Sequence, residues 1–247
     1  PSLLLWRALM SWFGGLIFIV ILVTVLPVVS GCFGLDFTVR QDRLFSPLWN
    51  RMTRPMREMT FLYIVLTLMA TIIYLIAGDA IFPAIILALF TISSGAGPMM
   101  DELPMIPQLM FGSGFVALLS ALPLLTLWQT LRRRTETQIT EHMELRAFFT
   151  LFLFTGTLLA IPPILSGTLP FLEALGQGYF YAISFLSTNG LMLESDMVFH
   201  PSSYLLLILL AVVGGCIGAA AGGFRLSRVL ILVSLSWTEM LHTLHPH

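Results

Sequence analysis

Charge is scarce in this sequence, and lysine is missing altogether. Charged residues make up 10% of the 247 positions, against roughly 25% in a soluble domain, while 57% of the positions are hydrophobic. A net charge of -1 offers no basic surface to nucleic acid, so we expect no nucleic-acid partner. With a mean hydropathy of +0.92, the composition predicts an all-α polytopic membrane protein that is surrounded by lipid.

Cysteine and catalytic motifs are scarce as well. Cys32 and Cys216 lie in or beside apolar stretches with no His or Cys at ligand spacing, which argues against a disulfide framework and a metal site. No His has a carboxylate placed to form a triad; the His residues are His142, His200, His242, His245 and His247. HExxH and GxSxG motifs are missing too. We therefore expect no enzyme, no cofactor and no resident metal ion.

Long uncharged runs divide the chain, and most of them have the about 20 residues that a helix needs to cross a bilayer. These runs are 8–35, 59–78, 80–100, 103–131, 147–172, 174–193 and 201–224. Between them stand two arginine clusters. The clusters are Arg40, Arg43, Arg51, Arg54 and Arg57, and then Arg132, Arg133, Arg134 and Arg146.

The arginine clusters predict the topology, because segments that stay in the cytoplasm carry more basic residues than exported ones. Residues 58–131 and 147–224 contain no basic residue, so each stretch should leave the cytoplasm and return. Each stretch holds three uncharged runs, and three full crossings would end on the wrong side. We therefore predict a helix, a re-entrant segment and a second helix in each, with 80–100 and 174–193 as the re-entrant segments.

The two stretches are copies of one unit. The spacing from Asp79 to Gly95 is 16 residues, and the spacing from Glu173 to Gly190 is 17. Four segments follow from the repeat. They are the closing helix of an incomplete first repeat (1–35), a cytoplasmic Arg-rich loop (36–57), a second repeat (58–134) and a third repeat that ends in a Gly-rich intramembrane loop (135–247).

Ser/Thr-rich segments with glycine stand at matching places in the two units. Irregular backbone at membrane depth is tolerated where it is buried in protein or lines a watery cavity, and ion filters use its carbonyl oxygens to replace a cation's hydration shell. The alternative is an ordinary helix cap or tight turn, but the repetition favours a filter. The candidate filter residues are Ser93, Ser94, Gly95, Thr188, Asn189 and Gly190.

Acidic residues follow each candidate filter on the side predicted to be non-cytoplasmic. They could concentrate cations at an outer mouth, and a solvated loop is the alternative interpretation. The outer-mouth candidates are Asp101, Glu102, Glu194 and Asp196.

Five glycines fall within residues 214–223, in the middle of a run that would otherwise cross the membrane. Each glycine costs about 1 kcal/mol relative to Ala in a helix, so a straight helix is disfavoured there. The run could be a break that moves as a gate, or small residues that permit close helix packing. The arginines that follow could mark the cytoplasmic boundary or stand near the ion path. The gate-loop candidates are Gly214, Gly215, Gly218, Gly222, Gly223, Arg225 and Arg228.

Several motifs resemble one known family, the TrkH/KtrB-type potassium transporters, over nearly the whole chain. Residues 5–15 (LWRALMSWFGG) are similar to FWRSxxQWxGG, residues 91–98 (TISSGAGP) to the filter TVATGGFS, and residues 144–148 to ELRAF. Residues 186–191 (LSTNGL) stand where the family has TTTGF, and 214–228 (GGCIGAAAGGFRLSR) resemble GGCAGSTGGGIKxxR. Residues 245–246 match the HP before a fourth repeat, so the resemblance implies that the first filter and the fourth repeat lie outside this chain.

The resemblance implies repeated helix, pore loop and helix units of the potassium-channel-like transporter type. It further implies transport of K+, or of Na+, across the bacterial inner membrane by a multi-pass protein whose Gly-rich loop acts as the gate. A homodimer and a cytoplasmic nucleotide-binding regulatory subunit are the implied partners. The sequence departs from the family at Asn189 in place of Thr, at 96–98 (AGP) and at 219–220 (AA). These departures leave a second hypothesis open, a degenerate, non-conducting relative that acts as a scaffold in a complex.

Overall fold

The computed structural model describes residues 2–32, 48–95, 106–122, 139–193, 201–216 and 219–244. Within these ranges the chain is almost entirely α-helical, as the composition predicts. The helices are α1 (Ser2–Cys32), α2 (Leu48–Ile76), α3 (Ile81–Ile92), α4 (Pro107–Ala121), α6 (Ile139–Leu165), α7 (Phe171–Leu186), α8 (Pro201–Val213) and α9 (Leu226–Leu244).

Three of these helices are long and apolar enough to cross a membrane. The spanning segments are Ser2–Ile21 of α1, Met56–Ile76 of α2 and Glu144–Leu165 of α6. Large apolar side chains lie exposed along all three, and Leu3 and Leu165 each expose more than four fifths of their surface. A soluble monomer rarely exposes contiguous apolar surface of this extent, as expected for a membrane protein. The prediction of a membrane protein is confirmed.

α2 begins at Leu48, within the segment 36–57 that was predicted to be a loop, and residues 36–47 lie outside the described part of the chain. Arg51, Arg54 and Arg57 therefore belong to a helix and not to a loop. The apolar segment of α2 starts at Met56, so Arg51 and Arg54 precede this segment and Arg57 lies at its start.

The middle helix of each unit is short. α3 has 12 residues and α7 has 16. At a rise of 1.5 Å per residue these helices are about 18 and about 24 Å long, less than the roughly 30 Å of a bilayer's hydrocarbon core. Non-helical backbone follows at Ser93 and Ser187. These are the segments predicted to be re-entrant, and their position in the membrane stays a prediction.

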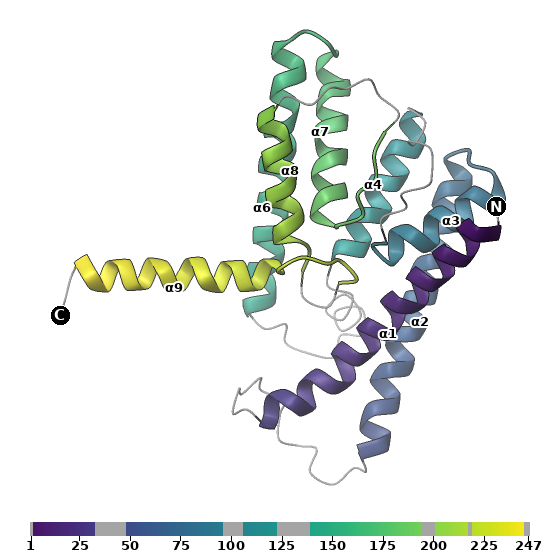
Figure 1. Cartoon of the computed structure of the whole chain (residues 1–247), viewed down its shortest axis with the longest axis vertical. Coiled ribbons are helices and arrows are strands. Elements are labelled where there is room, and N and C mark those ends of the chain that lie inside the picture. The colour runs from purple at the N-terminus through teal and green to yellow at the C-terminus, as the bar shows by residue number, and fades with distance from the viewer. Residues whose placement is uncertain are drawn as a thin grey trace.

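The two units pack into one body (Figure 1). α1 packs against α2 and α3, α7 packs most extensively against α6 and also against α8, and α4 joins the units by its contact with α7. A continuous core contains Tyr63 and Tyr74 of α2 together with Phe148 of α6, all fully buried. This core holds the ends of α3 and α7 in place.

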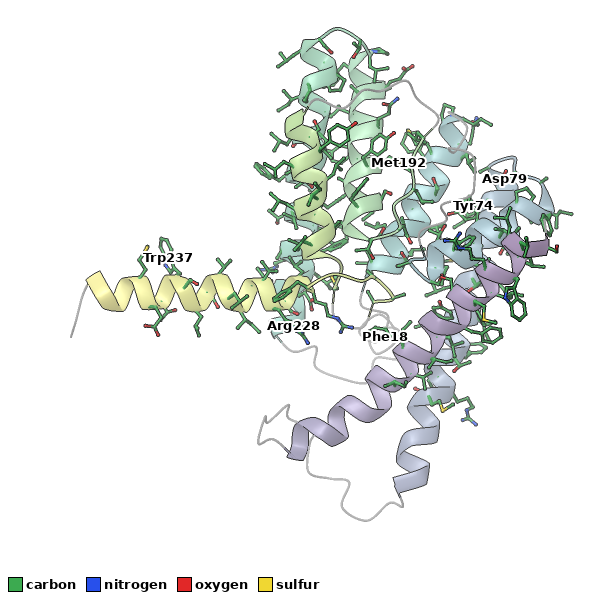
Figure 2. The ribbon with its side chains drawn as sticks, viewed as in Figure 1. Phe18, Tyr74, Asp79, Met192, Arg228 and Trp237 are labelled. Atoms are coloured by element: carbon green, nitrogen blue, oxygen red, sulfur yellow. The ribbon has the colours of Figure 1, made fainter. Side chains whose placement is uncertain are left out.

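The Gly-rich run is not a straight helix. α8 ends at Val213 and α9 begins at Leu226. α9 leaves the bundle in a direction very different from that of α8, and Trp237 lies on its outer half, at a distance from the other helices (Figures 1 and 2). The break lies where glycine is concentrated, as its helix propensity predicts.

Candidate functional site

The turn after α3 is a helix C-cap with an unusual residue in its left-handed position. Ser94 has φ +50°. The backbone N–H of Ser94 donates to the Thr91 carbonyl at 3.3 Å, and that of Gly95 donates to the Phe90 carbonyl at 3.0 Å. This pair of hydrogen bonds defines a Schellman motif, in which glycine usually occupies the left-handed position.

The turn after α7 has the same geometry. Thr188 has φ +58°. Its backbone N–H donates to the Phe185 carbonyl at 3.0 Å, and the N–H of Asn189 donates to the Ser184 carbonyl at 3.0 Å. A β-branched residue in this region is strained by roughly 1–3 kcal/mol, and such strain gathers at functional sites.

The two caps set a register between the units. Ser94 corresponds to Thr188, and Gly95 corresponds to Asn189. Residue identity pairs Gly95 with Gly190, and the backbone hydrogen bonds correct that pairing by one residue. Gly190, with φ +63°, lies one position beyond the cap, in a non-helical segment. The helix-cap interpretation therefore describes the local backbone of both turns, although it does not explain Ser and Thr where glycine would relieve the strain.

Two neighbouring helices brace the first turn. The Ser11 hydroxyl of α1 lies 2.9 Å from Ser93 Oγ, and Ser93 Oγ itself donates to the Leu89 carbonyl at 2.8 Å. Ser11 is therefore the donor of the pair. Gly95 approaches Ser11 so closely that a Cβ at this position would overlap the Ser11 hydroxyl. α2 adds a second brace, because Tyr74 Oη lies 2.9 Å from Thr91 Oγ1 and both side chains are buried.

α4 braces the second turn. Asn189 Nδ2 donates to Ser120 Oγ at 3.3 Å, and both residues are almost completely buried. Asn189 Oδ1 has no hydrogen-bond partner among the described residues. A buried acceptor of this kind costs about 1–3 kcal/mol, so this amide is retained at the expense of stability.

The second turn also touches the Gly-rich run. The backbone N–H of Gly222 donates to Thr188 Oγ1 at 2.8 Å. The two residues are 34 positions apart, and both were predicted to be functional, one in a filter and one in a gate. Their hydrogen bond joins the two candidate sites directly.

The Gly-rich run closes on itself at a narrow neck. The N–H of Phe224 donates to the Val212 carbonyl at 2.8 Å. Gly214 and Gly223 have φ +72° and +88°, and a Cβ on Gly223 would lie 2.8 Å from the Gly214 Cα. Two chain segments can cross this closely only where both lack side chains. Gly215 lies at the same neck, where its carbonyl accepts from the Leu226 N–H at 3.2 Å.

The end of α4 holds the same loop from another side. The N–H of Cys216 donates to the Ala121 carbonyl at 3.1 Å. Ala121 directly follows Ser120, so two consecutive residues contact the second turn and the loop. Cys216 is buried, as its apolar surroundings predict.

Arg225 lies half-buried at the base of the loop, with φ +72°. Its guanidinium carbon is 5.5 Å from the centre of the Phe18 ring of α1, a cation–π distance. The buried Glu144 of α6 and the exposed Arg228 of α9 also interact electrostatically with Arg225. Figure 2 places Phe18 and Arg228 on the side of the molecule where α9 begins. Arg225 thus links the loop to α1 and α6.

Several predicted site residues lie outside the described part of the chain: Gly218, Asp101, Glu102, Glu194 and Asp196. Asp79 is described, and it follows α2 beside Tyr74 (Figure 2). Partial burial raises the pKa of the Asp79 carboxyl above its usual range.

Sequence reasoning missed the braces Ser11, Tyr74 and Ser120. The available signal was a hydroxyl inside an otherwise apolar helix. Ser113 shows the same pattern, yet within the described residues it bonds only inside α4, to the Leu109 carbonyl at 2.7 Å. Which hydroxyl faces a turn depends on how the helices pack, and that packing was not readable from the sequence.

Comparison with known proteins gives relatives along the whole chain, although no family model matches. Trk system potassium uptake protein TrkI of Halomonas elongata is 24% identical over 99% of this chain. TrkH of Escherichia coli K12 is 25% identical over 100% of the chain, and TrkG of the same strain is 28% identical over 98%. The chain spans about half the length of these relatives, 50% to 52%.

The fold has a solved counterpart. The crystal structure of the potassium transporter TrkH from Vibrio parahaemolyticus matches all of this chain with a TM-score of 0.79 and 22% identity, and the match covers 51% of that protein. The relatives are named as uptake proteins and not as enzymes. The resemblance stated from the motifs is thereby confirmed, and over its whole length this chain is a relative of the Trk potassium uptake proteins with the fold of TrkH.

Proposed function

We propose that this chain forms part of a potassium-preferring cation pathway in a bacterial inner membrane, which it crosses several times. Backbone carbonyls at 93–95 and 188–190 replace the hydration shell of the ion. The loop at 214–223 opens and closes the path below them. No chemical step on a substrate is involved.

The observation that carries this proposal is the hydrogen bond from Gly222 N–H to Thr188 Oγ1. A filter and its gate must lie on one path, and this contact joins the two candidates although they are far apart in sequence. The strained left-handed residues Ser94 and Thr188, at equivalent places in two units, support the same interpretation.

The names of the relatives support potassium as the ion, since all those reported are potassium uptake proteins. Na+ is the alternative, because Asn189 occupies a position where the related family has Thr. Measuring K+ uptake and Na+ uptake with the same preparation decides between the two ions.

A homodimer and a cytoplasmic nucleotide-binding regulatory subunit complete the proposal. Both come from the family resemblance. Mass measurement of the purified protein tests the dimer, and nucleotide-dependent co-purification of a soluble subunit from native membranes tests the partner.

The deciding experiment is rescue of potassium-limited growth in a transporter-deficient bacterium by the full parent gene. We expect rescue by the wild type and none by Gly190→Asp at matched membrane expression, since a carboxylate side chain there disturbs the carbonyl geometry. Gly167→Asp is the matched control. Gly167 has φ +68°, close to the +63° of Gly190, and has open space around it in the turn between α6 and α7.

Equal rescue of growth by Gly190→Asp and Gly167→Asp would contradict a filter at residues 188–190. No rescue by a well-expressed wild type would favour the scaffold hypothesis, in which the fold is kept without transport.

A further inference from the structure

We propose that Ser120, at the end of α4, is a positioning residue that sets the ion preference of the second turn by holding Asn189, and that Ser11 of α1 does the same for the first turn through Ser93. This inference rests on the proposed function, because it assigns the residues that hold the carbonyls of that filter in place.

The contact between Ser120 and Asn189 has a defined direction. Ser120 Oγ donates its one proton to the Ala117 carbonyl at 2.8 Å. Its oxygen can then only accept, so the Asn189 side chain must present its NH₂ group, as it does at 3.3 Å. The amide is thereby fixed in one of its two orientations.

The burial of Asn189 identifies its side chain as a brace and not as an ion ligand. Only 1% of the residue is exposed. Gly190, the next residue, is exposed. An oxygen that water cannot reach is also out of reach of a cation in the path. The side chain therefore points into the protein and leaves coordination to the backbone.

The first turn is also contacted by a hydroxyl from a neighbouring helix. Ser11 donates to Ser93 Oγ at 2.9 Å. In each case a hydroxyl from the helix that closes the preceding unit reaches the turn of the next unit. The contacted residues differ, because Ser93 precedes the left-handed residue Ser94 whereas Asn189 follows Thr188, and the two hydrogen bonds run in opposite directions. What the two units share is the helix that supplies the hydroxyl.

Removal of a brace should change ion preference more than it changes folding. Carbonyls that are free to move can close around the smaller Na+, whereas carbonyls held apart favour the larger K+. Each substitution removes one neutral hydrogen bond to a turn, so we expect a loss of about fivefold in the K+/Na+ uptake ratio, which corresponds to about 1 kcal/mol.

The test uses the full-length parent protein in proteoliposomes, with K+ and Na+ uptake measured separately under the same gradient. Ser120→Ala and Ser11→Ala should each lower the K+/Na+ ratio about fivefold, and Ser120→Thr, which keeps the hydroxyl, should retain most of it. Ser113→Ala is the matched control. Ser113 lies on α4, is fully buried, and donates within its own helix.

A second variant separates positioning from packing. In an Asn189→Leu background, Ser120→Ala should change the ratio no further, because the partner through which Ser120 acts is gone. If Ser120→Ala lowers the K+/Na+ uptake ratio further in the Asn189→Leu background, the inference is wrong. It is also wrong if Ser120→Ala and Ser113→Ala give the same K+/Na+ uptake ratio.

Failure of the proposed function gives a different result. If the wild type takes up neither ion above protein-free vesicles, and K+ does not raise its unfolding temperature, both the cation pathway and the positioning role are wrong. If the wild type prefers K+ and Ser120→Ala shares that preference, only the positioning role is wrong.

Discussion

Thr188 and Gly222 are joined by a 2.8 Å hydrogen bond from the backbone N–H of the glycine to the threonine Oγ1. Thr188 is held in a left-handed conformation by its helix cap, and Gly222 belongs to the loop whose neck is formed by Gly214 and Gly223. The geometry of the second turn and the position of the loop therefore depend on each other.

Replacing Thr188 with Val should loosen this link. Valine keeps the β-branched shape and removes the acceptor, so the loop loses about 1 kcal/mol of restraint and passive cation flux should rise about fivefold. Flux into proteoliposomes without a regulatory partner measures the change. Thr188→Ser retains the oxygen and should behave like the wild type; equal flux in the two variants would show that the hydrogen bond does not restrain the loop.

Gly223→Ala should destabilise the protein by more than its backbone strain alone. The added Cβ would meet the Gly214 Cα at 2.8 Å and the Ala211 carbonyl at 3.1 Å. Gly167→Ala has a similar positive φ of +68° with nothing near its Cβ, and strain of this kind costs roughly 1–3 kcal/mol. In detergent, the unfolding temperature of Gly223→Ala should be well below that of Gly167→Ala. Equal unfolding temperatures would mean that the neck opens readily.

The neighbours Gly14 and Gly15 of α1 should respond in opposite directions to Ala. A Cβ on Gly14 has no atom within 4 Å, so Ala should stabilise the helix by about 0.5–1 kcal/mol. A Cβ on Gly15 would lie 2.7 Å from Tyr63 Oη and 3.3 Å from Ser93 Cβ. Gly15→Ala should therefore lower the unfolding temperature and impair uptake. A stabilising Gly15→Ala would contradict the packing of α1 against the first turn.

Asp79→Asn should stabilise the protein at neutral pH. Partial burial raises the pKa of Asp79 in the folded state, so the folded form is favoured while this carboxyl is protonated, and that advantage is lost as the pH rises through the folded-state pKa. Asparagine has no charge to desolvate. The unfolding temperature of the variant should exceed that of the wild type at pH 7, and the gap should close in acid. A gap that is constant with pH would exclude ionisation of Asp79 as its cause.

Much of the fold was predictable because lipid imposes simple demands on a chain. Runs of about 20 apolar residues must be helical, since every backbone group needs a partner in hydrocarbon, and α1, α2 and α6 meet that expectation. The interruption between Val213 and Leu226 was equally readable, because five glycines disfavour a helix wherever the chain places them. The start of α2 was misplaced, since a helix can continue into water beyond its apolar segment.

The repeat was predictable, but its register was not. Matching the two glycines paired Gly95 with Gly190, whereas the carbonyls that the caps use pair Gly95 with Asn189. Side-chain identity misled here, because the register follows from backbone hydrogen bonds, which any residue can make.

By itself the sequence determined the solvent of this protein, its helical class and the places where its helices break. These properties follow from composition and from short-range propensity, which act on each stretch of chain independently. Only the tertiary structure decided that Ser11 and Ser120, and not Ser113, reach the turns, and that Gly222 bonds to Thr188. Such contacts depend on which face each helix buries, and helices that are apolar on nearly every face carry too weak a pattern to reveal it.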